Sequence, residues 1–202
     1  MQNAKLIFRK NITQANELGA LYDYLSGLVR VPVPFDDLLR SQIVYAVSAF
    51  DKLLHDLIRI GMVQIFQGLR PATDKYKNER IAIQYLIQFA AGSTPPPAVR
   101  FEEIVREKLS VLSFQDPNKI ADGLSFIWGE EHKWKKIALS LDMPEVDVKL
   151  KQKLIVTRRN AIVHEADLDP VSGAKQLITR AEAADASQFL LAHGLNICDL
   201  IV

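Results

Sequence analysis

The chain has little of what would assign it to most compartments. Its 202 residues include one cysteine, Cys198, so an intramolecular disulfide is impossible, and such a lone thiol is typical of the reducing cytoplasm. No apolar run approaches the roughly 18 residues of a membrane span, and residues 1–10 lack the apolar segment of a secretory signal. We therefore expect a cytoplasmic protein that makes no membrane contact.

An excess of charge is also missing, because 25 Lys and Arg residues stand against 24 Asp and Glu residues, which leaves a formal net charge of +1. A chain of this kind that binds RNA must use a local basic site. A glycine-rich phosphate loop, the Cys/His spacing of a zinc site and an ordered Ser-His-Asp set are absent from the sequence. Neither a metal nor a cofactor is expected.

Helical periodicity is what the sequence does contain, and no segment alternates in the manner of a strand. The clearest case opens at Phe35-Asp36-Asp37 and runs to about Ile65 or Gly68, with apolar residues recurring at spacings of three and four. The fold class predicted is all-α. The further expected helices cover residues 12–29, 79–91, 99–112, 116–127, 130–139, 145–166 and 174–192.

Several local signals bound these helices. Asn11 is expected to cap the first one, and Asp116, followed by Pro117, the one at 116–127. Prolines predict an extended segment at 31–34 and a helix stop at 92–97, the best candidate for a linker. The helix at 79–91 is expected to be more buried than its neighbours, residues 169–173 to form a turn, and residues 197–202 to form a short extended tail.

The most informative stretch is Arg158-Arg159-Asn160-Ala161-Ile162-Val163-His164-Glu165-Ala166-Asp167. At about 100° per residue, Asn160 and His164 lie one turn apart on the same helix face, and Arg159 is offset from His164 by about 140°. A guanidinium holds a phosphate with forked donors, and an imidazole exchanges a proton near neutral pH. These are two of the parts needed to cleave a phosphodiester without a metal.

A structural role is the alternative for the same residues. Arg and His side chains often lie along a helix surface with their polar ends in water, and His164 can bond a neighbouring carbonyl. Ile155, Ile162 and Ala166 form a separate apolar stripe that can seat the helix on the core. The motif alone leaves both interpretations open.

The neighbourhood of the motif resembles the HEPN superfamily, whose ribonuclease members carry Arg, a polar residue that is often Asn, three variable residues and His. Residues 40–58 are similar to the first long helix of its RiboL-PSP branch, and Gln115–Asp122, Trp128 and the 134–138 segment follow in the same order. The resemblance covers roughly residues 36–170, and the Arg, Asn and His positions match without departure.

This resemblance implies one all-α domain over residues 1–202, built round two long antiparallel helices, with residues 1–35 as an N-terminal helical extension. It also implies a homodimer in which two Arg/His motifs face each other across a cleft. The implied activity is metal-independent endoribonuclease cleavage, in a toxin, stress-response or phage-defence setting. RNA is the expected partner, and an antitoxin or regulatory protein a further one.

Each motif residue has an expected chemical role. The RNA 2′-hydroxyl attacks the adjacent phosphorus, His164 acts as general acid or base, and Arg159 holds the phosphate. Asn160 orients the histidine or the phosphate. Arg158 is a second candidate for the phosphate contact, and the sequence does not separate the two arginines. One histidine cannot be base and acid at once, so a two-fold dimer would supply the second.

Asp51, His55 and Asp56 form a second cluster. Asp51 and His55 lie one turn apart and can pair, so both are secondary candidates for the cleft. The adjacent pair His55-Asp56 is also found in HD-type metal phosphohydrolases, but the remaining ligands of such a site are not in order here. A helix-stabilising pair is the favoured interpretation.

Two basic stretches are candidates for RNA contact. Lys149, Lys151 and Lys153 precede the motif and predict a positive approach to it. The run Lys133-Trp134-Lys135-Lys136 either stacks and binds RNA or is a solvated helix face with the tryptophan in the core. The alternative function is a non-catalytic HEPN-like module that binds a partner protein, nucleic acid or nucleotide.

Overall fold

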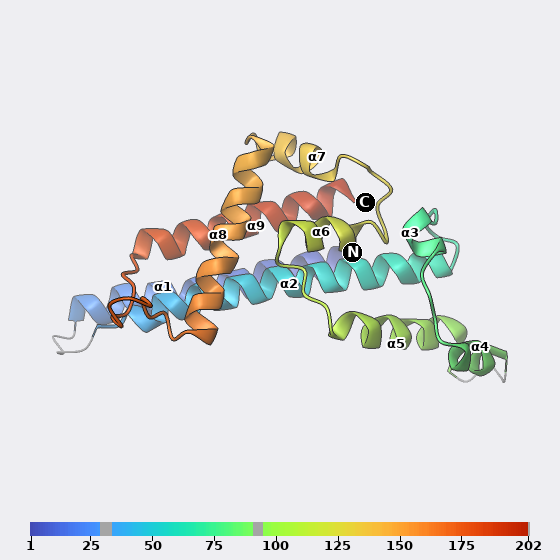
Figure 1. The fold of residues 1–202 in the computed structure, drawn as a ribbon, viewed down its shortest axis with the longest axis horizontal. Coiled ribbons are helices and arrows are strands. Elements are labelled where there is room, and N and C mark those ends of the chain that lie inside the picture. Colours follow the sequence, from blue (N-terminus) through green and yellow to red (C-terminus); the bar gives the residue numbers. More distant parts are fainter. Residues whose placement is uncertain (29–33, 91–94, 202) are drawn as a thin grey trace.

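The computed structural model describes residues 1–28, 34–90 and 95–201, and within these ranges the chain forms nine helices and no strand (Figure 1). The all-α fold class is therefore as predicted. No helix in these ranges combines the length and the apolar character needed to cross a lipid bilayer.

Three long helices lie side by side and carry the core. α1 (Gln2–Leu28) and α2 (Asp36–Phe66) run antiparallel, and α9 (Arg180–Leu200) packs against both (Figure 1). The contact of α1 with α9 is close, because a Cβ placed on Gly194 would lie 2.5 Å from the ring of Phe8. The N-terminal helix is thus built into the same core as the rest of the chain.

A fourth long helix, α8 (Glu145–His164), crosses this layer steeply (Figure 1) and contacts α2. The remaining helices are shorter and cover the outside: α5 and α6 pack on α2, α7 packs on α8 and α9, and α4 packs on α5. Their bounds are Asp74–Lys77 for α3, Ile83–Ala90 for α4, Pro97–Ser110 for α5, Pro117–Leu124 for α6 and Lys133–Ser140 for α7.

Helix starts follow the expected chemistry. Asp36 and Asp37 stand in the first turn of α2, where carboxylates oppose the positive end of the helix. The Asp116 side chain accepts a hydrogen bond from the backbone N–H of Asn118 at 2.8 Å, and Pro117 is the first residue of α6, as predicted. The start of the last helix, by contrast, was predicted in the wrong place.

The prediction for the first helix was wrong at its start. α1 begins ten residues earlier than the predicted residue 12, so Asn11 lies inside the helix and does not cap it. The buried residues of α1 explain the length, because they keep helical spacing from the first turn onward. They are Ala4, Phe8, Ile12, Ala15 and Gly19.

The predictions for the C-terminal region were wrong in two places. The last helix is Arg180–Leu200, displaced from the predicted 174–192, and residues 197–200 are helical where an extended tail was expected. The predicted turn at 169–173 is present, and residues 174–179 are needed for the chain to return beside 167–169. Ile197, Cys198 and Ile201 are buried, so packing extends the helix to the end of the core.

The predicted burial of the helix at 79–91 was also wrong. α4 covers Ile83–Ala90, and its Ile83 and Ile87 side chains are 74% and 63% exposed. α4 packs on α5 at the end of the bundle, where its Phe89 ring stacks on Phe66 and is only partly buried. Most of the expected extended segment at 31–34 and half of the helix stop at 92–97 lie outside the described residues.

His193 lies at the centre of the packed helices. Its side chain is fully buried, and the rings of Phe50, Trp134 and Phe189 surround it at centroid distances of 4.9, 5.5 and 5.6 Å. Its Nδ1 donates to Oε1 of Gln152 on α8 at 3.1 Å. Burial lowers the pKa of His193 from 6.5 to about 3, so the imidazole is neutral in the folded protein.

This burial predicts a loss of stability in mild acid. The unfolded chain protonates His193 below about pH 6.5 and the folded chain does not, so stability is full above that pH and falls as the pH drops toward 3. We expect this group to remove about 2 kcal/mol between pH 7.5 and pH 5. Urea unfolding at both pH values measures it, and His193→Gln should lose that part of the slope. An unchanged slope in the variant would contradict the assignment.

Candidate functional site

α8 has two different faces. Val148, Gln152 and Ile155 are buried against the core, whereas Val146 and Leu150 on the opposite side are 73% and 51% exposed. At about 100° per residue, His164 lies on the outer face in line with Val146. The last residue of the helix is thus presented on a mixed surface, where Val146 and Leu150 lie beside the exposed polar side chains of Lys153 and Asn160.

The chain leaves α8 through a tight reversal. The backbone N–H groups of Glu165 and Asp167 both donate to the carbonyl of Ala161, at 3.0 and 2.9 Å. Ala166 and Asp167 have φ values of +53° and +59°, in the left-handed region that side chains other than glycine adopt at a cost. Such a reversal needs contacts that hold it in place.

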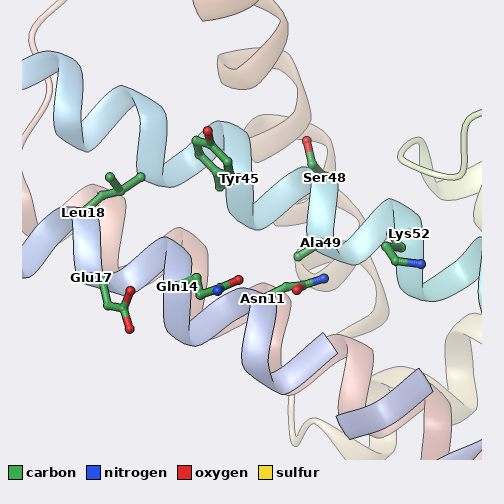
Figure 2. A pocket seen from close by; sticks show the side chains of 8 residues that line it. All are labelled: Asn11, Gln14, Glu17, Leu18, Tyr45, Ser48, Ala49 and Lys52. Atoms are coloured by element: carbon green, nitrogen blue, oxygen red, sulfur yellow. The ribbon is translucent and has the colours of Figure 1, made fainter. Parts of the chain in front are cut away.

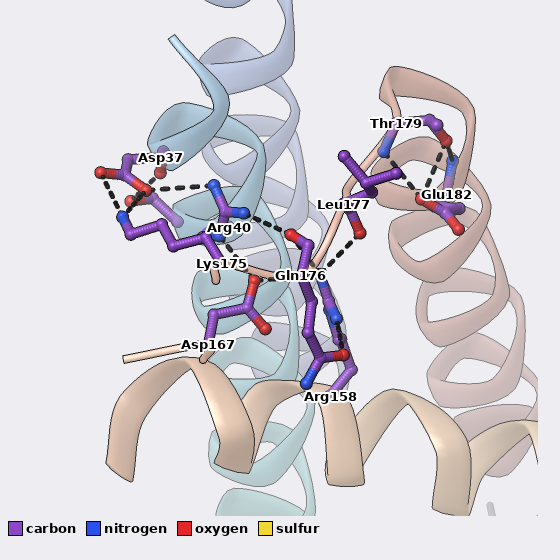
Figure 3. Close-up of polar contacts among 10 residues, drawn as sticks. Asp37, Arg40, Arg158, Asp167, Lys175, Gln176, Leu177, Thr179 and Glu182 are labelled. Carbon is purple, nitrogen blue, oxygen red and sulfur yellow. Dashed lines mark hydrogen bonds and ion pairs between the residues drawn. The ribbon is translucent and has the colours of Figure 1, made fainter. Parts of the chain in front are cut away.

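A buried carboxylate supplies those contacts. The Asp167 side chain is fully buried, and its Oδ2 accepts from Nε of Arg40 at 2.6 Å and from Nη2 of Arg158 at 2.9 Å (Figure 3). Arg40 is on α2 and Arg158 on α8, and their side chains are 7% and 23% exposed. We call these three residues the Asp167 network.

The network also holds residues 176–177, which follow the turn, through their backbone carbonyls. Arg40 Nη2 donates to the Gln176 carbonyl at 2.7 Å, and Arg158 Nη2 donates to the Leu177 carbonyl at 2.9 Å (Figure 3). Arg158 Nη1 also bonds the Gln176 side chain. The forked donors of Arg158 are therefore directed at the protein itself.

Arg159 has a different environment from its neighbour. Its Nη1 donates to Oδ1 of Asn160 at 3.1 Å, and among the described residues no carboxylate lies within ion-pair distance of its guanidinium. Asn160 and His164 are exposed. In the same part of the chain, no hydrogen bond or ion pair engages the His164 side chain. The three motif residues thus combine one cation, one amide and one imidazole near the end of α8.

The secondary cluster on α2 has contacts that explain a structural role. Asp51 Oδ1 accepts from the backbone N–H of Phe114 at 2.7 Å, and Oδ2 accepts from Nε2 of Gln115 at 3.1 Å. His55 Nε2 lies 3.8 Å from Asp51 Oδ1, and its ring packs edge-on against Phe114. The pair ties the segment before α6 to α2.

The lysines of α8 are not equally available. Lys149 pairs with Glu145, and Lys151 with Asp185 at 2.8 Å. Lys153 is exposed and makes no ion pair within the described ranges. Lys153 is therefore the α8 lysine whose charge no carboxylate of the described residues neutralises.

The basic run at 133–136 does not offer a stacking surface. Trp134 is 7% exposed, its Nε1 donates to the Pro117 carbonyl at 3.2 Å, and its ring contacts His193. The RNA-stacking interpretation of this run is therefore wrong for the tryptophan, which belongs to the core. Burial also lowers the pKa of Lys133, whose ammonium donates to the Glu130 carbonyl.

Two grooves of the surface are lined by neither Arg159 nor Asn160 nor His164. One groove of about 490 Å³ lies between α1 and α2 and is lined by polar side chains and the exposed ring of Tyr45 (Figure 2). Another of about 360 Å³ lies between α8 and α9, with Leu154, Arg158 and Leu177 at its edge. The described residues contain no group of three His, Cys, Asp or Glu side chains placed to hold a metal ion.

Sequence reasoning missed the role of Arg40 and Asp167. Asp167 is in the quoted motif and Arg40 in the quoted helix, but neither was given a function. One signal was available, because Arg40 sits beside Leu39 and Ile43 on the apolar side of an amphipathic helix. A charge at such a position implies a buried partner.

Comparisons with known proteins give one family. The model of the family described as RiboL-PSP-HEPN matches residues 9–202, which is longer than the 36–170 on which the sequence resemblance was strongest. No curated protein and no solved structure matches the chain significantly.

The geometry predicts effects of different size for the two adjacent arginines. Arg158→Ala should lower the free energy of unfolding by about 2–4 kcal/mol, because it removes one partner of a buried carboxylate. Arg159→Ala should change it by less than about 1 kcal/mol, because no ion pair is lost. Guanidinium unfolding at pH 7.5 measures both. Equal losses in the two variants would contradict this division.

Proposed function

Because the chain belongs to the RiboL-PSP-HEPN family, we propose that it is a metal-independent endoribonuclease whose catalytic residues are Arg159, Asn160 and His164. HEPN domains include ribonucleases, and the fold is the expected one. The proposal is supported above all by the exposure of the motif residues and by the charge of Arg159, which is unpaired among the described residues. His164 and Asn160 are exposed beside a guanidinium that no carboxylate of the described residues neutralises.

The proposed reaction needs only groups that the RNA and the motif supply. The 2′-hydroxyl attacks the adjacent phosphorus while an imidazole removes its proton, and the bond to the 5′-oxygen breaks as that oxygen gains a proton. His164 serves in this proton transfer. Arg159 binds the phosphate and stabilises the charge that grows on its oxygens, because a guanidinium offers parallel donors to two of them. The products are a 2′,3′-cyclic phosphate and a 5′-hydroxyl.

Asn160 is proposed to link Arg159 and His164. Its Oδ1 accepts from Arg159 at 3.1 Å, and it lies one turn before His164 on the helix. The amide therefore fixes the guanidinium on the side of the helix that carries the imidazole. Arg158 is assigned no phosphate contact, because Asp167 and two backbone carbonyls already bind it.

We propose that two copies of the chain form the working enzyme. One histidine cannot accept the proton of the attacking hydroxyl and protonate the leaving oxygen in the same step, and a second motif supplies the other group. The outer face of α8 is the surface proposed for the contact. Val146, Leu150 and His164 lie on it in line, so two copies that pack in parallel along this face, related by a two-fold axis along the helix, bring the two motifs to face each other.

The biological setting proposed is RNA cleavage in the cytoplasm as a toxin, stress-response or phage-defence activity, restrained by an antitoxin or regulatory protein. Lys153, exposed and unpaired within the described ranges, is the lysine proposed to meet the RNA backbone first. Lys149 and Lys151 contribute once RNA displaces the carboxylates that they now bind.

The central prediction concerns His164. The purified protein should cut RNA in the presence of EDTA and leave 2′,3′-cyclic phosphate ends, and His164→Ala should slow cleavage on the order of 100-fold or more. Gel analysis of cleaved RNA and end-group chemistry measure both. His132→Ala is the matched control, because His132 is also exposed and lies in a loop before α7.

Two results would overturn the proposal. One is full activity of His164→Ala, and the other is cleavage that EDTA abolishes. Binding of RNA, a nucleotide or a protein without cleavage by the wild-type protein would favour the non-catalytic module.

The dimer gives a separate prediction. Leu150→Glu places a carboxylate in the proposed contact and should weaken self-association on the order of 100-fold or more, with cleavage reduced in parallel. Sedimentation velocity and RNA cleavage measured across protein concentrations test it. Val111→Glu is the control, since Val111 is 85% exposed at the end of α5. A wild-type protein that is a monomer at every concentration but cleaves RNA would exclude the dimer.

A further inference from the structure

The Asp167 network brackets His164 along the chain. Arg158 precedes His164 by six residues on α8, and Asp167 follows it by three, after the left-handed residue Ala166. Both ends of this short segment meet at one carboxylate oxygen, Oδ2 of Asp167. The position of the imidazole is thus defined from both sides by contacts that are buried.

Arg40 anchors this arrangement to a different part of the fold. It lies in the second turn of α2, 127 residues before Asp167, and its 2.6 Å bond is the shorter of the two that the carboxylate accepts. Its other donors reach the Gln176 carbonyl at 2.7 Å and the Asp37 carboxylate at 3.2 Å. α2 is the central helix of the bundle, so the network ties the end of α8 to the helix that packs against most of the other long helices.

A second ion pair ties the same loop to α2 without reaching α8. Lys175 Nζ bonds the Asp37 carboxylate at 2.8 and 3.1 Å, and its hydrogen bond lowers the pKa of Asp37 (Figure 3). Both side chains are at least half exposed, and the Lys175 side chain makes no other hydrogen bond or ion pair within the described residues. The Lys175–Asp37 pair therefore differs from the Asp167 network in its exposure and in its lack of contact with α8, which carries the motif, although Asp37 also accepts a hydrogen bond from Arg40.

We propose that Arg40 and Asp167 are positioning residues for the imidazole of His164, and that they act through the reversal after α8 and through Arg158. This inference rests on the proposed endoribonuclease function for its kinetic consequence only. A misplacement of about 1 Å at a catalytic group costs on the order of 100-fold in rate, whereas phosphate binding by Arg159 is left in place. Removal of the network should therefore lower kcat and leave KM nearly unchanged.

The test compares Arg40→Gln, Asp167→Asn and the control Lys175→Gln in the full-length protein labelled with ¹³C-histidine. The ring C–H signal of His164 should shift or broaden in the first two variants and remain in place in the control. The signal of His132, which is remote in the sequence and exposed, serves as the internal reference. Cleavage kinetics should show kcat reduced at least on the order of ten-fold in the first two variants, with KM within about two-fold.

Arg40→Lys and Arg158→Lys separate positioning from stability. Each keeps the positive charge beside Asp167 but loses the forked donors, so the fold is retained while the geometry loosens. All measurements are made well below the midpoint of thermal unfolding of each variant. An intermediate His164 signal with an intermediate kcat is expected for both.

Two outcomes would overturn the proposal. The first is a wild-type His164 signal in folded Arg40→Gln and Asp167→Asn. The second is unfolding of every variant including the two lysine variants, because the network would then serve stability alone. If the wild-type protein does not cleave RNA, the proposed function fails, and the His164 signal still decides whether the network positions the imidazole.

Discussion

The structure depends most on one buried carboxylate. Asp167 is fully enclosed, and a charge in that position is tolerated only when opposite charges and hydrogen bonds surround it. Arg40 and Arg158 meet that need at Oδ2, at 2.6 and 2.9 Å, and in doing so they join α2, α8 and the hairpin that follows α8, while Oδ1 is buried without a hydrogen-bond partner among the described residues. The left-handed backbone at Ala166 and Asp167 persists because these contacts hold it. Because Arg158 pairs with Asp167, its guanidinium is used within the protein, whereas that of the adjacent Arg159 is not part of this pairing.

α8 has a packed face and an exposed face. Its inner face is fixed by Val148, Ile155 and the hydrogen bond between Gln152 and the buried His193, so the outer face is not needed for packing within the chain. That face carries the exposed side chains of Val146 and Leu150 among polar residues and ends at His164. Apolar side chains therefore occur on both sides of α8, which leaves the helix with little periodic contrast. The proposed dimer uses this outer face, and the histidine at its end places the proposed chemistry beside the partner copy.

The sequence was sufficient for what local rules decide. The span of α2 followed from its spacing, and the start of α6 followed from Asp116 and Pro117. It was insufficient where burial by distant elements decides. α1 extends to Gln2 because α2 and α9 cover its first turns, and α9 reaches Leu200 because Ile197 packs inside. The choice between Arg158 and Arg159 was also out of reach, because it depends on a partner, Arg40, that lies more than 100 residues away in the chain.

Arg158 and Arg159 also show that a short sequence motif does not specify which of two adjacent residues is available to bind a ligand. Adjacent residues on a helix point about 100° apart, so at the end of α8 only one of them can face the Asp167 carboxylate. Arg158 takes that direction, and its donors are directed at Asp167, Gln176 and Leu177. Arg159 is turned away from that carboxylate and meets the amide of Asn160. A guanidinium without a carboxylate partner retains its affinity for an external oxyanion, and among the described residues Arg159 has no such partner. Because Arg158 is bound within the fold, Arg159 is the arginine proposed to contact the phosphate.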